Sequence, residues 1–277
     1  MSKSVLILFV VFTSCFYDAF AQNLESIILL KTEVGEIKIK LYNETPKHRD
    51  NMLKLIEQHF YDSLMFHRVI DNFMIQTGDP ESKNAIPEIM LGNGGPNYLI
   101  DAEIVPELIH KKGVLAAARQ GDDVNPEKKS SGSQFYIVEG QIIDNESLDK
   151  YVEKIKYTQK RNVFFDYLLL SENKEIKHKY DSLQAAKSIY QLRDLTKQIT
   201  EKLIDKYNEI DKQKILSQQQ REVYSTIGGT PHLDGGYTVF GEVIEGMDVV
   251  DIISKYEVDK YSRPIKDIRI ISIELIK

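Results

Sequence analysis

The sequence predicts a mainly β protein whose β pattern is interrupted once by a long helical segment. Short runs of alternating apolar and polar residues, separated by glycine and proline turn signals, occupy both ends of the chain. Residues 141–227, by contrast, contain neither glycine nor proline. Several short strands joined by turns are typical of a barrel or a sandwich, and the helical segment is then an insertion of about 85 residues.

The composition is that of a soluble globular protein with a full hydrophobic core. Apolar residues make up 42% of the 277 residues and charged residues 28%, which is typical of one or two globular domains. The net charge is −6, whereas nonspecific binding to nucleic acid requires a basic face. No nucleic-acid partner is therefore predicted.

Residues 1–21 have the pattern of a secretory signal peptide. Lys3 precedes an apolar run, and Ala19-Phe20-Ala21 supplies the small residues after which signal peptidase cleaves. The sequence therefore predicts an exported protein that begins at Gln22, with the periplasm as its compartment. Lipoprotein processing at Cys15, the only cysteine, and an N-terminal core strand are the alternatives. Cleavage after Ala21 would leave no cysteine for a disulfide or a thiol nucleophile.

Strand patterns stand near both ends of the mature chain. In the second half of residues 26–42, after a Val34-Gly35 turn, isoleucine and leucine alternate with lysine, which predicts a hairpin. A helix is expected to follow from Pro46, because proline suits the first helical position. Residues 267–275 alternate as well, but the phase changes at Ile270-Ile271, as a β-bulge would cause.

The segment from Tyr61 to Pro80, YDSLMFHRVIDNFMIQTGDP, places one arginine among apolar residues. Arg68 stays charged and offers a rigid fork of donors, so an apolar strand that carries it must direct the fork to a partner or a ligand. The apolar residues that follow can form a pocket beside this cation. A surface arginine on an edge strand is the alternative, because surface arginines are the commoner kind.

Three other stretches stand out from the chain around them. Residues 113–119, GVLAAAR, have small side chains that let another backbone approach closely. Residues 130–138, SSGSQFYIV, are typical of a strand, and residues 229–241, GTPHLDGGYTVFG, follow the helical segment. The glycine-rich loop at 90–98 lacks the lysine of a phosphate-binding loop, so a plain turn is predicted there.

Residues 141–227 are predicted to form two or three helices, with a break near residues 171–174. Apolar residues step by three or four along the segment, which produces a seam that must be buried. A helical hairpin that closes on itself would cover the seam. A groove for a protein partner, or a coiled-coil dimer, is the alternative.

These stretches resemble the sequences of the cyclophilins, a family of peptidyl-prolyl cis-trans isomerases. The resemblance is carried by FHRVI and FMIQTGD in the arginine segment, by GSQFYIV, and by LDGGYTVFG after the helical segment. It implies an eight-stranded closed antiparallel barrel with a helix at each end. The barrel would comprise residues 22–140 and 228–277, with residues 141–227 inserted between them. The implied function is prolyl isomerisation in exported proteins, in support of their folding.

The resemblance also implies roles for individual residues. Arg68 is the expected catalytic residue, and the expected substrate-binding residues are Phe73, Met74, Gln76, Ala118, Arg119, Gln134, Tyr136, His232, Leu233 and Tyr237. Tyr136 stands where the family usually has phenylalanine, and its added hydroxyl needs a partner or water. His232 replaces a frequent tryptophan and Tyr237 a frequent histidine, so ligands that depend on that tryptophan are in doubt.

The implied reaction is rotation about Xaa-Pro bonds in proline-containing polypeptides. Rotation costs about 18–20 kcal/mol because amide resonance is lost, and Arg68 would donate a hydrogen bond to the twisted nitrogen. This chemistry requires no cofactor and no metal. Two other functions remain as alternatives: a chaperone or holdase whose helical segment binds unfolded protein partners, and a non-catalytic interaction scaffold.

Overall fold

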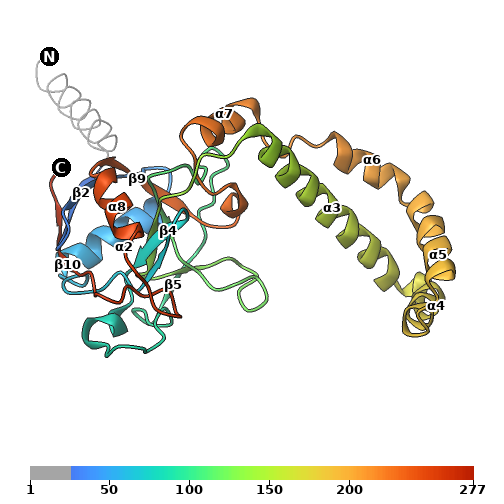
Figure 1. The fold of residues 1–277 in the computed structure, drawn as a ribbon, viewed down its shortest axis with the longest axis horizontal. Coiled ribbons are helices and arrows are strands. Elements are labelled where there is room, and N and C mark those ends of the chain that lie inside the picture. The colour runs from blue at the N-terminus through green and yellow to red at the C-terminus, as the bar shows by residue number, and fades with distance from the viewer. Residues whose placement is uncertain (1–25) are drawn as a thin grey trace, which may run out of the picture. The chain divides into compact units, whose positions relative to one another are not determined.

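The computed structural model describes residues 26–277, so the predicted signal peptide and Cys15 lie outside the described residues. The chain divides into two compact units. The first contains the described residues up to Ile142 and again from Thr226, and the second is Ile143–Ser225. All the labelled strands in Figure 1 belong to the first unit, and the second unit is built from helices.

An antiparallel, eight-stranded sheet curls around the core of the first unit (Figure 1). Its strands pair in the order β10-β1-β2-β9-β6-β8-β4-β3. Their bounds are β1 Ile27–Thr32, β2 Glu36–Leu41, β3 Arg68–Ile70, β4 Met74–Thr77, β6 Val114–Ala117, β8 Phe135–Val138, β9 Val239–Glu245 and β10 Ile270–Leu275. A separate two-stranded sheet pairs β5, Leu99–Ile100, with β7, Ser130–Ser131.

The sheet is an open half-barrel, so the prediction of a closed barrel was wrong. β3 and β10 are the edge strands of the sheet and are not neighbours in it. The loop before β10 covers the free edge of β3, because the Val69 amide donates to the Ser262 carbonyl at 2.7 Å. An isolated bridge between Met65 and Arg269 lies beside the two edges. This bridge and the backbone hydrogen bonds from Ser63 to Ile270, from Ile270 to Leu64 and from Phe66 to Ile268 stand where a closed barrel would have a continuous ladder.

The predicted hairpin and the predicted bulge are both confirmed. β1 and β2 pair in antiparallel register, and alternate residues of each strand are buried. On the other side of β1, Lys31 pairs with Ser272 but Thr32 pairs with Ile270. Ile271 is therefore the extra residue of a bulge, which explains the change of phase in the sequence.

β6 and β8 are buried on both faces, and this divides the apolar residues of the sheet into two clusters. Phe135 and Ile137 of β8 belong to the main core, whereas Tyr136 and Val138 belong to a second cluster that includes Met74. Successive side chains of a strand point to opposite faces. The strands that complete the core therefore also supply a second apolar surface, and the candidate site is built on that surface.

Two α-helices of the first unit pack against the sheet. α2, Pro46–Glu57, contacts β9 and β10, and α8, Met247–Ser254, contacts β2, β3 and β4. Two 3-10 helices, η1 at Pro80–Asn84 and η3 at Pro231–Leu233, lie in the loops. Among residues 26–277, no helix has the length and apolar character needed to cross a membrane.

The second unit holds more helices than the two or three predicted. They are α3 Asn145–Leu169, α4 Lys174–Ala185, α5 Ile189–Lys202, α6 Ile204–Lys212 and α7 Gln218–Thr226, with the 3-10 helix η2 at Ser171–Asn173. η2 lies where the break was predicted. The additional breaks fall at Ala186–Ser188, Leu203 and Gln213–Ser217, where no glycine or proline marks them.

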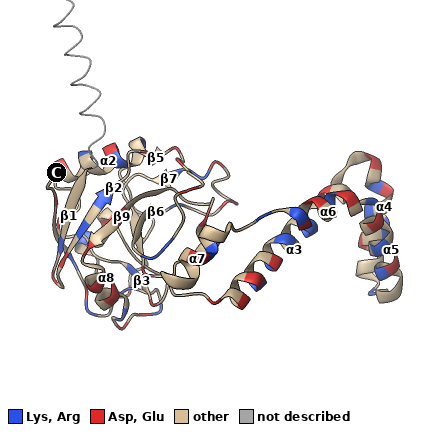
Figure 2. Cartoon of the chain, turned by 90° about the horizontal axis from the view of Figure 1, so that it is seen from above, with Lys and Arg blue, Asp and Glu red and all other residues tan. Residues whose placement is uncertain are grey.

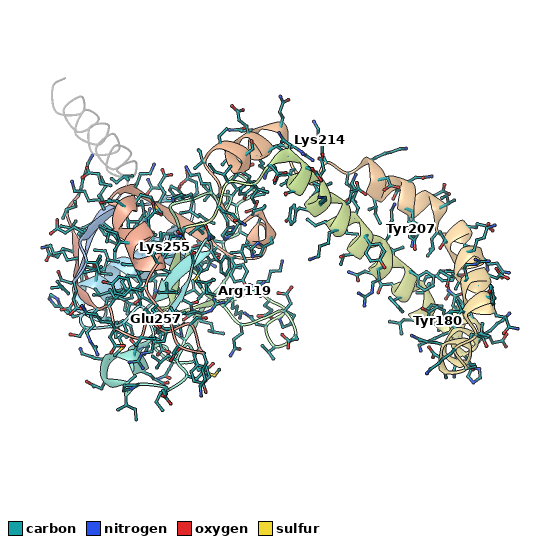
Figure 3. The ribbon with its side chains drawn as sticks, in the orientation of Figure 1. Arg119, Tyr180, Tyr207, Lys214, Lys255 and Glu257 are labelled. Atoms are coloured by element: carbon teal, nitrogen blue, oxygen red, sulfur yellow. The ribbon has the colours of Figure 1, made fainter. Side chains whose placement is uncertain are left out.

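A small core of its own holds the helical unit together. Phe164 and Leu168 of α3 pack with Leu195, Ile199 and Leu203. Two tyrosines labelled in Figure 3 border this core: the Tyr180 ring lies 5.6 Å from the Phe164 ring, and the Lys160 ammonium lies 5.7 Å from the Tyr207 ring. Residues of both charge signs are spread along these helices (Figure 2). The predicted apolar seam is thus at least partly buried within the unit itself.

The chain leaves and re-enters the first unit at one place. The Gly229 amide donates to the Gln141 carbonyl at 3.0 Å. A Cβ at Gly140, whose φ is +61°, would lie 2.5 Å from the Gly229 Cα, so this close approach requires glycine. Inside the second unit the Ile143 amide donates to the Tyr224 carbonyl at 3.0 Å. Both ends of the helical unit are therefore fixed to each other by backbone hydrogen bonds.

Candidate active site

Four neighbouring strands each place one residue in a row across the sheet. Arg68 of β3 pairs with Gln76 of β4, Gln76 pairs with Tyr136 of β8, and Tyr136 pairs with Ala116 of β6. Directly paired residues of antiparallel strands lie on the same face of a sheet. The strand register alone therefore brings a cation, an amide and a phenol together on the second apolar surface.

A cavity of about 250 Å³ lies at this row. Its lining is His67, Arg68, Phe73, Met74, Gln76, Leu91, Gly92, Ala118, Arg119, Tyr136, Leu233 and Tyr237. Two residues predicted for the site are absent from this lining. The His232 ring stacks on the Phe73 ring, with centroids 5.4 Å apart and planes 30° apart, and Gln134 lines the neighbouring hollow.

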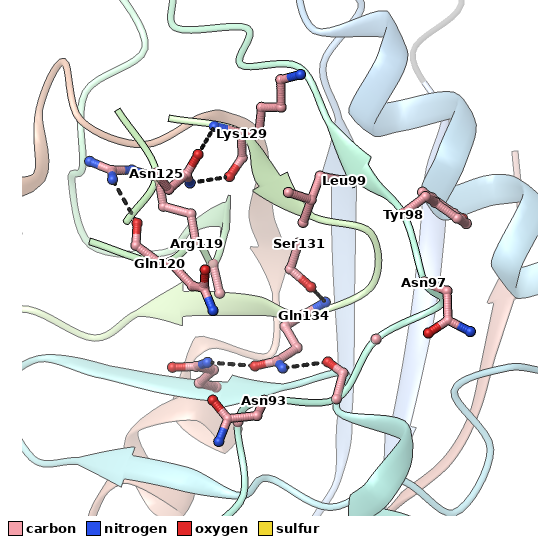
Figure 4. A pocket seen from close by; sticks show the side chains of 15 residues that line it. Asn93, Asn97, Tyr98, Leu99, Arg119, Gln120, Asn125, Lys129, Ser131 and Gln134 are labelled. Carbon is pink, nitrogen blue, oxygen red and sulfur yellow. Dashed lines mark hydrogen bonds between the residues drawn. The ribbon is translucent and has the colours of Figure 1, made fainter. Parts of the chain in front are cut away.

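The neighbouring hollow, of about 320 Å³, shares part of its wall with the cavity (Figure 4). Both are lined by Gln76, Gly92, Ala118 and Arg119. The other residues of the hollow are mainly polar or glycine: Asn93, Gly94, Gly95, Asn97, Tyr98, Leu99, Gln120, Asn125, Lys129, Ser131 and Gln134. The two spaces therefore form one groove with a mainly apolar part and a mainly polar part.

Arg68 is half-buried in the wall of the cavity. Its Nη1 donates to Gln76 Oε1 at 3.3 Å, and its guanidinium carbon lies 5.9 Å from the centre of the Phe73 ring. Burial lowers the pKa of Arg68 from its ordinary value, but an arginine stays protonated in a protein. Because a guanidinium has five donors, Arg68 keeps donors for a ligand in the cavity.

A chain of side-chain amides fixes the acceptor that holds Arg68. Gln76 Nε2 donates to Gln134 Oε1 at 3.0 Å, and Gln134 Nε2 donates to the Gly94 carbonyl at 2.7 Å. Figure 4 shows both hydrogen bonds. Because the side-chain nitrogen of Gln76 donates to Gln134, the side-chain oxygen of Gln76 is the atom that faces Arg68.

A buried carboxylate anchors the glycine loop at the end of this chain. Asp79 is fully buried and accepts hydrogen bonds from the Gly92 amide at 2.5 Å and the Gly94 amide at 3.4 Å. A Cβ at Gly94 would lie 2.1 Å from Asp79 Oδ1. Glycine is therefore required for the loop to approach the carboxylate, and Asp79 helps to position Gln134.

The hydroxyl of Tyr136 is bonded to a buried histidine. His110 is fully buried; its Nε2 lies 3.0 Å from the Tyr136 hydroxyl and its Nδ1 lies 3.0 Å from Asp234 Oδ1. Because an ionised carboxylate can only accept, Nδ1 carries the proton and Nε2 accepts from the tyrosine. Burial raises the pKa of Tyr136 well above its ordinary value, so the phenol stays neutral. His110 is thus the partner that the sequence required for this hydroxyl.

Arg119 forms a wall between the two hollows, and its charge is paired. Its Nε donates to the Gly236 carbonyl at 2.6 Å, and its Nη1 lies 2.7 Å from Asp122 Oδ1. Its guanidinium carbon lies 4.5 Å from the centre of the Tyr237 ring. Among the described residues Arg68 has no carboxylate within ion-pair distance. Of the two cations that line the cavity, Arg68 is therefore the one available to a ligand.

Comparison with known families identifies this arrangement. The sequence model of the family described as cyclophilin type peptidyl-prolyl cis-trans isomerase/CLD matches residues 27–166 and 212–275. The chain belongs to the cyclophilin-type peptidyl-prolyl cis-trans isomerases. It is therefore an isomerase by family. Residues 167–211, which include α4 and α5, are not covered by the match.

Other proteins resemble this cyclophilin over nearly all of its described length. A Staphylococcus epidermidis protein assigned to the peptidyl-prolyl cis-trans isomerases is 25% identical over 92% of this chain and 93% of its own length. A Streptococcus pyogenes relative, described as a bifunctional phosphatase/peptidyl-prolyl cis-trans isomerase, is 26% identical over 90% of this chain. This chain spans 38% of that relative.

A solved structure supports the fold assignment. A cyclophilin of Cryptosporidium parvum superimposes with a TM-score of 0.53, covering 92% of this chain and 99% of that chain, at 20% sequence identity. At this identity the likeness concerns the fold alone. The same Cryptosporidium protein has also been solved in the presence of the dipeptide Ala-Pro.

The cyclophilin cavity contains residues that the sequence motifs did not single out. His67, Leu91 and Gly92 line it, and His110 and Asp234 lie behind Tyr136. His67 directly precedes Arg68 within FHRVI, so its position in the motif could have marked it. His110 and Asp234 are 124 residues apart in sequence, and no local pattern connects them. Among residues 26–277, no three His, Cys, Asp or Glu side chains are grouped as a metal site would require.

His67 is a buried histidine whose ring lies beside the Met65 backbone and the Gln134 side chain. It is 3% exposed, and burial lowers its pKa to about 4. The nearby Asp79 carboxylate raises the pKa of His67, whereas the charge of Arg68 lowers it further. The His67 imidazole is therefore neutral at physiological pH. It places no second positive charge beside Arg68.

We expect the stability of this cyclophilin to decrease as the pH falls from 6.5 to about 4 because of His67. In the unfolded chain His67 binds a proton near pH 6.5, but in the folded chain only near 4. The unfolded state therefore carries more protons in this window, and acid favours unfolding by up to about 3 kcal/mol.

The replacement His67→Gln removes this titration while keeping a polar side chain. Urea denaturation at pH 7.5 and pH 4.5 would give the free energy of unfolding of both proteins. The wild type should lose more stability between the two pH values than the His67→Gln variant. Equal losses would show that other groups carry the acid sensitivity.

Proposed function

We propose that the cavity around Arg68 is where this cyclophilin isomerises Xaa-Pro bonds of polypeptide substrates. One observation carries the proposal: an arginine without a carboxylate partner in the described structure is held by Gln76 beside an apolar wall. That wall is made of Phe73, Met74, Tyr136 and Leu233. An apolar wall suits a pyrrolidine ring, and a donor suits the prolyl nitrogen next to it. The dipeptide Ala-Pro, in whose presence the Cryptosporidium protein was solved, contains such a ring and such a nitrogen.

The reaction breaks no covalent bond, so catalysis consists of stabilising the twisted amide. Rotation removes the amide resonance, and its barrier is about 18–20 kcal/mol. The nitrogen then regains a lone pair and can accept a hydrogen bond, which it cannot do in either planar state. A donor fixed at that point stabilises the transition state more than the substrate. In our proposal Arg68 is that donor.

The remaining residues of the site bind or position in this proposal. Gln76 holds the guanidinium, and Gln134 fixes Gln76 through the amide chain to Gly94. Ala118 and Arg119 form the wall shared by the two hollows, where an extended substrate chain can pass from one to the other. His232 supports the Phe73 ring by stacking, and Tyr237 packs on Arg119.

The replacement Arg68→Ala tests the mechanism. We expect kcat/KM for a short Xaa-Pro peptide to fall by about 10²-fold or more, the scale seen when one transition-state donor is removed. Exchange spectroscopy of the cis and trans signals would measure the rate, and circular dichroism would verify the fold. The matched variant Arg68→Lys keeps the charge but not the fork, so it should recover only part of the rate.

Two outcomes would contradict this assignment in different ways. A folded Arg68→Ala variant with wild-type turnover would exclude Arg68 as the donor. A wild-type protein that isomerises no Xaa-Pro peptide would instead favour the non-catalytic scaffold.

We also propose that the protein is exported, with a folding role in the periplasm. The pattern of residues 1–21 supports this proposal, since Ala19-Phe20-Ala21 matches a signal peptidase site. Intact-mass measurement of the protein secreted by its native host should give a chain that begins at Gln22. A chain that begins at an acylated Cys15 would replace this proposal with a lipoprotein, and an uncleaved chain would exclude both.

A second proposed function concerns the helical segment. We propose that residues 141–227 are an insertion between the half-barrel segments, which the sequence places at 22–140 and 228–277, and that the insertion binds unfolded clients. Large apolar side chains stay exposed on its helices, among them Tyr157 at 69%, Leu169 at 69%, Ile189 at 74% and Tyr190 at 78%. Where exposed apolar side chains gather into a patch, the patch marks a surface that binds other proteins.

Replacing Ile143–Tyr224 with a short Gly/Ser linker tests this second function. The backbone bond between Gln141 and Gly229 already holds the two ends together, and closing a shorter loop changes the entropy only slightly. We expect a folded half-barrel that isomerises a tetrapeptide at the wild-type rate but no longer delays the aggregation of an unfolded protein. Loss of folding would show that the helices complete the core of the half-barrel, and unchanged protection against aggregation would exclude client binding by them.

A further inference from the structure

We propose that the surface made by Ile86, Ile89 and Met90 docks apolar side chains of the substrate polypeptide near the proline being isomerised. We call it the Ile86 surface. The inference rests on the proposed function, because it extends the substrate groove beyond the cavity. It assigns this cyclophilin a preference for clients with apolar residues close to the Xaa-Pro bond.

A tight turn displays the apolar side chains of the Ile86 surface. Pro87 and Glu88 form the turn, and Glu88 has a φ of +64°. A type II turn requires positive φ at its third position, and proline is common at its second. Such a turn brings its first and fourth residues, Ile86 and Ile89, to within 7 Å of each other between Cα atoms. The two isoleucines are therefore presented as a pair.

These side chains face solvent although they are large and apolar. Ile86 is 67% exposed, Ile89 46% and Met90 62%. Single exposed apolar residues are common on protein surfaces, but here three lie within five residues of one loop. Between Ala85 and Leu91 the only charged residue is Glu88. The patch therefore suits an uncharged, apolar partner.

The loop is held in place at both ends. Arg263, which is 4% exposed, donates to the Ile86 carbonyl at 2.8 Å and to the Ala85 carbonyl at 3.2 Å. Its own charge is fixed by Asp267 at 2.8 Å. At the other end the Gly92 amide donates to the buried Asp79. Because both ends are anchored, docking on the turn costs less ordering entropy than docking on a loose loop.

The loop that carries the Ile86 surface continues along the chain into the wall of the cavity. Leu91 and Gly92 line the cavity, and Met90 is the next residue along the chain. Consecutive Cα atoms are 3.8 Å apart, so Ile89 lies within about 7.6 Å of Leu91. An extended substrate spans that distance with two or three residues. Continuity with the groove is the reason to assign this surface to the substrate chain rather than to a second protein.

The experiment compares two peptides that share one Ala-Pro core. One carries serine and glycine on both sides of the core, and the other carries leucine and phenylalanine. Exchange spectroscopy gives kcat/KM for each peptide with the wild type, with the triple variant Ile86→Ser/Ile89→Ser/Met90→Ser, and with Ile271→Ser. Ile271 is the matched control, because it is 57% exposed and lines neither hollow.

We expect the wild type and Ile271→Ser to prefer the apolar-flanked peptide by about 10-fold, as burial of one or two large side chains would produce. The triple variant should lose that preference while isomerising the serine-glycine peptide at the wild-type rate. Equal losses on both peptides, or a preference that survives in the triple variant, would overturn the proposal.

Two further outcomes distinguish substrate docking on the Ile86 surface from failure of the proposed function and from self-association of the chain. A wild type that isomerises neither peptide overturns the proposed function itself, whereas isomerisation without a preference overturns the Ile86 surface alone. Sedimentation of the wild type and the triple variant tests the other occupant, a second copy of this chain. A wild-type dimer that the three serines dissociate would assign the surface to self-association and overturn substrate docking.

Discussion

The hydrogen bond from Arg68 to Gln76 is the interaction on which the candidate site depends. A half-buried charge beside apolar rings is costly unless a polar partner compensates it, and a carboxylate partner would neutralise the cation. An amide oxygen holds the guanidinium without removing its charge. The same amide is fixed by Gln134, and Gln134 by a glycine loop that Asp79 anchors. The cation is therefore positioned by a chain of neutral groups that ends at a buried anion.

The sheet makes this arrangement compatible with a stable core. Along β4 and β8, one face contributes side chains such as Ile75 and Ile137 to the main core, and the opposite face contributes Gln76 and Tyr136 to the site. Fixing the core register thus fixes the site register, since a slip of one residue would exchange the two faces. The polar contacts of Tyr136 with His110 lie on the site face, so they do not interrupt the apolar core.

Local patterns in the sequence predicted much of this fold, and family motifs predicted most of the cavity wall. The alternation before Leu41 and the phase change at Ile271 each have a local physical cause, so both could be recognised. The open edge of the sheet could not be predicted. No local pattern shows that the backbone of Val69, at this edge, bonds to the loop residue Ser262 instead of to another strand. The Tyr136 hydroxyl signalled a missing partner, but His110 and Asp234 come together only through the tertiary fold.

β9 has a consequence for the order in which the chain folds. It occupies a central place in the sheet, between β2 and β6, yet it follows the whole helical unit in sequence. Its pairing therefore requires closure of a very long loop, which is slow when the loop is an unfolded chain. The helical contacts are local and form rapidly, and the bond between Ile143 and Tyr224 brings the two ends of that unit together. Early folding of the helices would shorten the effective loop and let the central strand reach its place.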